Sequence, residues 1–169
     1  MTHQASAGNV DMEYAKRGWP VRPDDDGATT WFNGDLYSVK LSGGQTGGQI
    51  GLVEAMVPPG DGPAPHVHAG TDVLRRHREL EFLSGDKEFN VAAGDVAFVP
   101  RGNVHRFHNA GIRPATLVFI YTPGGAEGLI VEGGDEPQPG VRVQPWGPDR
   151  IDERMLGLLA QYDTVLPPQ

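Results

Sequence analysis

Short runs of β-prone residues, separated by turns that contain glycine, make up the middle of this sequence. Within these runs apolar residues recur with the two-residue period of a strand, because successive side chains on a strand point to opposite faces. The last run carries apolar side chains at both odd and even positions, which predicts a strand buried on both faces. The pattern predicts strands over residues 36–41, 49–57, 64–68, 79–83, 87–91, 96–100, 104–109 and 115–122.

Composition favours an all-β fold over a helical bundle. The chain of 169 residues contains 24 Gly and 15 Pro, and both residue types destabilise the interior of a helix. Residues 149–162 are the one segment with convincing helical periodicity, and Asp149 is in position to cap it. We expect this short C-terminal helix to pack on the β domain through an apolar stripe of Ile151, Met155, Leu158, Leu159 and Tyr162.

The chain divides into three parts. We expect an irregular N-terminal arm over residues 1–30 and one β domain over residues 31–132. Residues 133–169 form a loop, the C-terminal helix and a tail. No internal repeat points to an array of small units.

Charge and composition exclude several classes of function. The formal net charge is −8, and a chain with so acidic a balance repels nucleic acid. No apolar stretch is long enough to span a membrane, and residues 2–9 are too polar for a secretion signal, so we expect a cytoplasmic protein. The chain has no Cys, so a metal site must use His, Asp or Glu.

Three histidines are candidate metal ligands. His66 and His68 are two residues apart on a predicted strand, so both imidazoles face the same side. Farther along, a strand and a Pro/Gly turn lead to His105, which shares its face with Phe107, whereas His108 falls on the opposite face. Imidazole suits Zn, Cu, Fe and Ni. The alternative is that these histidines are scattered, hydrogen-bonded surface groups.

These two segments resemble the paired motifs of the cupin superfamily, small β-barrels that often hold a divalent metal ion. Similarity extends over roughly residues 31–130 and is to bacterial monocupins of the quercetin 2,3-dioxygenase-like group. The resemblance implies a single cupin barrel (a double-stranded β-helix, or jelly roll), a small-molecule substrate and a homodimer. The matching residues are Gly60, His66 and His68 in the first motif and Gly94, Pro100, Gly102, His105 and Asn109 in the second.

The resemblance also implies an activity, an oxygenase acting with O2 on a small aromatic or enolisable substrate. The three histidines would hold Fe, Mn or Ni, with Zn also compatible, and Asp72 would be a fourth ligand and the catalytic base. Candidates for an apolar wall of the substrate pocket are Phe98, Phe107, Phe119 and Tyr121, and the alternative is that most of them belong to the core. Two alternatives stay open, a non-oxidative metal cupin (an isomerase or cyclase) and a non-catalytic binding cupin.

The first motif departs from the family pattern after His68. The family glutamate falls at Asp72, which is shorter by one methylene, or at Val73, which cannot ligate. The closing glycine is absent, and the basic run Arg75-Arg76-His77-Arg78 stands where a cupin has an apolar strand. One hypothesis is true divergence, with the run in an exposed loop. The other is a compensated frame disturbance in the gene. The codons GTC-GTC-ACC-GGG encode Val-Val-Thr-Gly. If a C precedes them and the frame starts at that C, they become CGT-CGT-CAC-CGG, which encodes Arg-Arg-His-Arg.

Sequencing the gene across this stretch separates the two hypotheses. A frame disturbance predicts compensating insertions or deletions on either side of residues 75–78, and an apolar run in the corrected reading. A source gene that encodes the same basic run without such changes contradicts it.

Overall fold

A computed structural model describes residues 28–76, 80–141 and 143–168. The expected N-terminal arm therefore lies almost wholly outside the described residues. The strands are β1 (Thr29–Phe32), β2 (Asp35–Leu41), β3 (Gly51–Val57), β4 (Val67–His68), β5 (Asp72–Arg76), β6 (Leu80–Ser84), β7 (Lys87–Val91), β8 (Val96–Val99), β9 (His105–His108), β10 (Ala115–Thr122) and β11 (Thr164–Val165). The helices are α2 (Glu127–Gly133), α3 (Glu153–Gln161) and a 3-10 turn, η1 (Pro148–Arg150).

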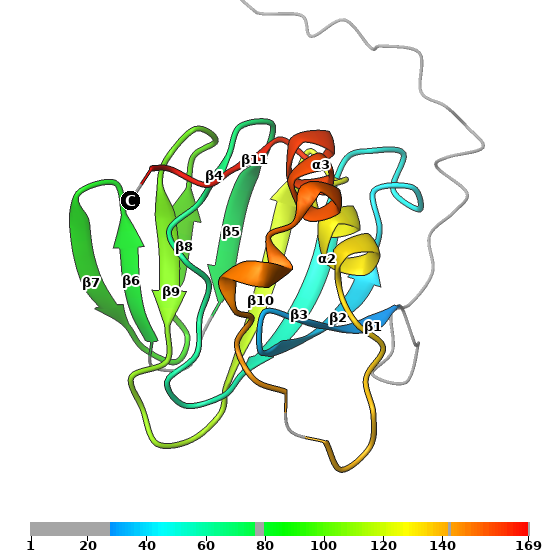
Figure 1. The fold of residues 1–169 in the computed structure, drawn as a ribbon. Coiled ribbons are helices and arrows are strands. Elements are labelled where there is room, and N and C mark those ends of the chain that lie inside the picture. The colour runs from blue at the N-terminus through cyan, green and yellow to red at the C-terminus, as the bar shows by residue number, and fades with distance from the viewer. Residues whose placement is uncertain (1–27, 77–79, 142, 169) are drawn as a thin grey trace, which may run out of the picture.

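The strands form two layers, as an all-β cupin barrel requires (Figure 1). One layer is a six-stranded sheet in the order β1-β2-β3-β10-β5-β8. The other layer contains the β7-β6-β9 sheet and the β11-β4 pair. An isolated β-bridge between His66 and His105 connects these two parts. The two helices lie close together beside the six-stranded sheet.

The core lies between these layers because each strand turns one face inward. On β10, Leu117 and Phe119 are buried and stand opposite Ala55 and Val53 of β3. The second layer contributes side chains such as Phe82 and Phe107 to the same cluster. The expectation that β10 is buried on both faces is wrong: Thr116 is exposed, and Val118 and Ile120 are only half-buried.

The strands expected between residues 36 and 122 are present with small shifts at their ends, except that the one expected over 64–68 is reduced to β4, Val67–His68. β1, β5, β11 and α2 were not expected. β5 includes part of the basic run and pairs with both β10 and β8. The hypothesis that this run lies in a loop is therefore wrong for Arg75 and Arg76, and His77 and Arg78 lie outside the described residues. β1 begins at Thr29 and α2 extends to Gly133, across the expected boundaries of the β domain.

The C-terminal helix is shorter than expected and has a different cap. Asp152 precedes α3 and its Oδ1 accepts a hydrogen bond of 2.8 Å from the Met155 amide, whereas Asp149 belongs to η1. Met155 and Leu159 are buried, but Ile151 is exposed. No described helix is long and apolar enough to cross a membrane.

Helix α2 is stabilised mainly by tertiary contacts, because its own residues have a low helix propensity. Its seven residues include two glycines, and a helix of this length is marginal by itself. The buried carboxylate of Glu127 accepts hydrogen bonds from the amides of Gly43, at 2.5 Å, and Gly125, at 2.8 Å. Leu129 and Ile130 bury the apolar side of the helix.

One carboxyl group, on Asp35, is buried beside the core. Its side chain is 1% exposed, Oδ2 accepts a hydrogen bond of 3.2 Å from the Tyr37 hydroxyl, and Oδ1 has no partner among the described residues. Burial raises the pKa of Asp35 to about 8; the Tyr37 hydrogen bond opposes the shift and the nearby Asp61 carboxylate adds to it. Asp35 is therefore mostly protonated at neutral pH.

Replacing Asp35 by Asn should flatten the pH dependence of the unfolding free energy. The folded protein keeps the Asp35 proton up to about pH 8, whereas the unfolded chain loses it above about pH 4. Unfolding then releases a proton, so this contribution to stability falls as pH rises between those values, by at most about 1.4 kcal/mol per pH unit. Urea unfolding at about pH 5.5 and pH 8 measures the effect.

The exposed Asp86→Asn variant is the matched control for this experiment, and it should keep the wild-type pH slope. A slope for Asp35→Asn equal to that of the wild type contradicts the prediction.

Candidate metal centre

Two backbone segments that are distant in sequence pair directly and bring the histidines together. The amide of His66 donates to the carbonyl of His105 at 3.0 Å, and the amide of His105 donates back to the carbonyl of His66 at 2.9 Å. The Gly102 amide donates to the His68 carbonyl at 2.8 Å. These bonds place the start of β4 against the start of β9.

The other end of the same pairing is fixed by Asn109. Its carbonyl accepts from the Gly60 amide at 2.7 Å, and its amide donates to the Asp61 carbonyl at 2.9 Å. The buried side chain donates to the carbonyls of Val57 and Arg113, each at 2.9 Å. Between the two ends, a Cβ atom on Gly62 would collide with the Phe107 carbonyl, so only glycine allows this close approach.

The three histidine side chains converge at one point of the barrel. One ring nitrogen from each of His66, His68 and His105 lies within 4.8 Å of the other two. The ring centroids are 4.3 Å apart for His66 and His105, and 5.0 and 5.2 Å apart for the pairs that include His68. His105 is fully buried, His68 is nearly so, and His66 is half-buried.

Hydrogen bonds at Nδ1 fix the tautomer of these rings. The Nδ1 atoms of His66 and His105 lie 3.0 Å from the carbonyl oxygens of Ala64 and Asn103, which can only accept. The Nδ1 atom of His68 lies 3.2 Å from the hydroxyl oxygen of Thr164. Nδ1 therefore carries the proton in His66 and His105, and Nε2 carries the lone pair that a metal needs.

This donor set fits a divalent metal ion. Neutral imidazoles with protonated, hydrogen-bonded Nδ1 atoms are the usual arrangement of metal-ligating histidines, because the second bond orients the ring and raises its basicity. His66, His68 and His105 could therefore hold a metal ion through Nε2. Three imidazoles suit first-row transition metals and do not select among them.

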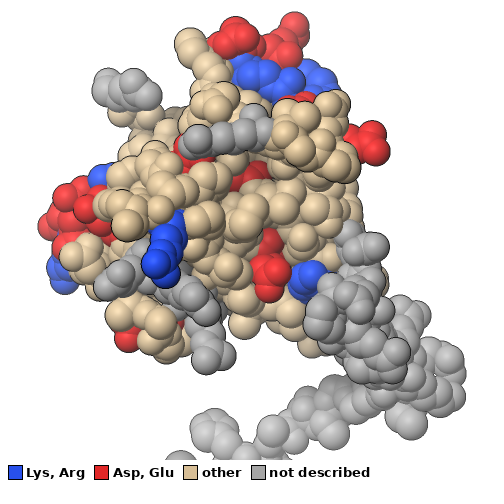
Figure 2. Space-filling view, turned by 90° about the horizontal axis from the view of Figure 1, so that it is seen from below, with Lys and Arg blue, Asp and Glu red and all other residues tan. Residues whose placement is uncertain are grey.

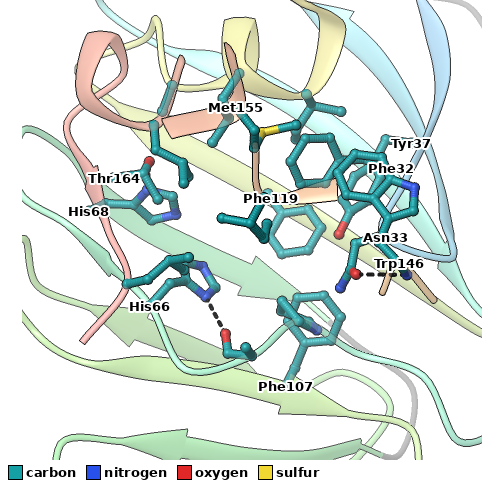
Figure 3. A pocket seen from close by; sticks show the side chains of 18 of the residues that line it. Phe32, Asn33, Tyr37, His66, His68, Phe107, Phe119, Trp146, Met155 and Thr164 are labelled. Carbon is teal, nitrogen blue, oxygen red and sulfur yellow. Dashed lines mark hydrogen bonds between the residues drawn. The ribbon is translucent and has the colours of Figure 1, made fainter. Parts of the chain in front are cut away.

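Two of the three histidines, His66 and His68, line an apolar cavity of about 400 Å³. In Figure 3, His66 and His68 lie on one side, Phe119 is central, and Asn33 and Trp146 lie on the other side. The predicted wall residues Phe107, Phe119 and Tyr121 line it. Other lining residues come from α2, α3 and the C-terminal part of the chain, namely Leu129, Ile130, Trp146, Ile151, Met155, Leu159, Thr164 and Leu166.

Two predicted site residues lie elsewhere. Phe98 is 56% exposed and does not line the cavity, because Ala97 and Val99 are the inward residues of β8. Asp72 is not in the histidine group. Its carboxylate accepts hydrogen bonds from the Arg101 side chain and backbone amide, which hold the pKa of Asp72 below its usual value and make it a weaker base.

Three contributors to the site were not predicted from sequence. Thr164 and Trp146 lie in segments that the motifs do not reach, and Asn33 lies in the turn between β1 and β2. Neither periodicity nor motif spacing marks them. A two-residue strand such as β11 is too short to give a pattern.

In the view of Figure 2, acidic and basic side chains are interspersed, and residues of other types cover most of the face.

Comparison with known proteins supports the cupin assignment. Residues 53–121 match the family model described as a cupin domain. That match contains all three histidines and ends before α2, α3 and β11. No curated protein matches the chain.

Solved structures share the fold. A predicted oxalate decarboxylase from Thermotoga maritima is 22% identical, with a TM-score of 0.51, and the match covers 53% of this chain and 80% of that one. KdgF from a Halomonas species is 13% identical, with a TM-score of 0.54 and coverage of 62% and 94%. A Klebsiella pneumoniae protein with a double-stranded β-helix domain is 27% identical, with a TM-score of 0.49 and coverage of 62% and 84%. The first two show that the chain has the cupin fold.

The double variant His66→Ala/His105→Ala should lose its metal. Removing two of three imidazoles leaves a single ligand, which cannot retain a divalent ion through purification. Metal content per chain, measured by mass spectrometry, should fall from about one in the wild type to near zero in the variant. His108→Ala is the control, because His108 lies outside the group and contacts Glu81. Unchanged metal content in the double variant would exclude the site.

Proposed function

We propose that this cupin-fold protein is a metal-dependent oxygenase that acts with O2 on a small aromatic or enolisable substrate, in the manner of the quercetin 2,3-dioxygenase-like group. The observation that carries the proposal is a group of three histidines, two of which, His66 and His68, line an aromatic cavity. A cavity of about 400 Å³ is within the range of small-molecule sites.

The cavity wall favours a neutral, apolar substrate. Among the described residues that line it there is no Lys, Arg, Asp or Glu. Phosphorylated or acidic sugars need such groups for recognition, whereas planar aromatic molecules pack against rings such as Phe107, Phe119 and Trp146.

Asn33 offers one polar contact on the side of the cavity away from the histidines. Its Oδ1 accepts a hydrogen bond of 3.3 Å from the Trp146 amide, which fixes the orientation of the side-chain amide. The nitrogen of that amide faces the cavity (Figure 3). It can donate to a carbonyl or hydroxyl oxygen of a bound substrate.

A bound ion would be held by His66, His68 and His105, with Fe, Mn or Ni proposed and Zn also compatible. Such an ion supplies Lewis-acid polarisation of a substrate oxygen and positions substrate and O2. No carboxylate joins the histidine group in the described chain. This favours substrates with an acidic enol or phenol hydroxyl, which need little help from a protein base.

The position of Asp72 also favours a second candidate, a cupin that binds such a molecule without oxidising it. General-base assistance contributes roughly 10²–10⁴-fold to a rate, and Arg101 engages the one carboxylate that the family motif would supply. An isomerase or cyclase using the same apolar cavity would turn substrate over without consuming O2.

Oxygen uptake with a panel of flavonols, including quercetin, tests the proposal. The protein is loaded separately with Fe(II), Mn(II) and Ni(II), and O2 consumption is followed beside substrate loss. We expect uptake in proportion to substrate loss with at least one metal and none with His66→Ala/His105→Ala, while His108→Ala behaves as wild type. Substrate loss without O2 uptake would instead assign an isomerase or cyclase. Binding without turnover would assign a binding protein.

A further inference from the structure

The C-terminal strand reaches the candidate metal centre. β11 pairs antiparallel with β4, so that Thr164 stands opposite His68 and Val165 opposite Val67. The Thr164 hydroxyl oxygen lies 3.2 Å from Nδ1 of His68, and both residues are more than nine-tenths buried. The two are 96 residues apart in sequence.

A second hydrogen bond sets the direction of the first. The Thr164 hydroxyl donates to the carbonyl of Tyr162 at 3.2 Å. A hydroxyl has a single proton to donate, so its oxygen must accept from the Nδ1–H of His68. The proton of His68 then lies on Nδ1, and the lone pair lies on Nε2.

His68 differs from His66 and His105 in the kind of group that accepts the hydrogen bond from its Nδ1 atom. His66 and His105 each use a carbonyl two residues earlier in their own segment, from Ala64 and Asn103. His68 depends on a side chain from another part of the chain. Docking of the C-terminal segment therefore supplies the hydrogen bond at Nδ1 of His68.

Several contacts dock that segment. The Ala69 amide donates to the Asp163 carbonyl at 2.7 Å. Asp163 has a positive φ of 49°, which turns the chain out of α3 toward β4. Met155 and Leu159 bury the inner side of α3. Thr164 and Leu166 also line the cavity, so the same segment closes it beside the histidines.

We infer that Thr164 is a positioning residue of the metal centre: its hydroxyl holds His68 in the tautomer and orientation that bind metal, and so makes the C-terminal strand part of the site. The inference rests on the proposed three-histidine centre. It adds to that centre a residue outside the cupin-domain match at residues 53–121.

Cobalt(II) binding to the full chain tests the inference. Thr164→Val keeps the size of the side chain and removes the hydroxyl, whereas Thr164→Ser keeps the hydroxyl. Loss of an outer hydrogen bond to a ligating histidine typically weakens metal affinity by about 10–100-fold. We expect that loss for Thr164→Val, with an altered Co(II) absorption spectrum, and near-wild-type affinity and spectrum for Thr164→Ser. Val165→Ala, at an exposed position of β11, is the matched control and should bind as wild type.

The outcomes separate this inference from the proposed function. If the wild type does not bind Co(II), the histidine centre itself is wrong, and the inference fails with it. If the wild type binds and Thr164→Val binds equally well, the inference alone is overturned. Equal weakening by Thr164→Val and Thr164→Ser also overturns it, because packing and not the hydroxyl would be responsible. Thermal unfolding of each metal-free variant establishes folding, and Thr164→Ala replaces Thr164→Val if the latter does not fold.

Discussion

The site depends on the antiparallel backbone pairing between residues 60–68 and 102–109. Its hydrogen bonds join Gly60 to Asn109 at one end and Gly102 to His68 at the other. Gly60 and Gly102 both have positive φ, of 83° and 78°, a conformation that costs glycine little and other residues more. The motif glycines and asparagine therefore hold two chain segments in one register, and that register makes the imidazoles converge.

The surroundings of the three histidines in the barrel determine which chemistry the site can support. His66 and His68 lie between a buried backbone pairing and an apolar cavity, and a hydrogen bond at Nδ1 of each of the three rings orients it. The histidines that would hold an ion adjoin aromatic residues of the cavity wall and, through His68, the C-terminal strand. The described lining residues include no Lys, Arg, Asp or Glu, and this is the reason for proposing a neutral, planar substrate.

Local patterns predicted the features that depend on neighbouring residues. The two-residue period of a strand is enough to place His66 and His68 on one side and to separate His105 from His108. Phe98 was wrongly expected in the pocket wall, because Val96 and Phe98 are as apolar as Ala97 and Val99, and hydrophobicity alone cannot choose between two apolar faces of β8. In the folded chain Ala97 and Val99 are buried, whereas Val96 and Phe98 are exposed.

The sequence by itself determined the β class, the positions of most strands and the three histidines, because each follows from periodicity or from turn residues at short range. Only the tertiary structure decided that Arg101 engages Asp72, that Asp152 caps α3 and that Thr164 contacts His68. The cap of α3 is local, a bond from the Met155 amide to Asp152, whereas the ion pair at Asp72 and the contact at His68 join residues far apart in the chain. Such contacts exist only after packing has fixed the relative positions of whole elements, and no local pattern records them.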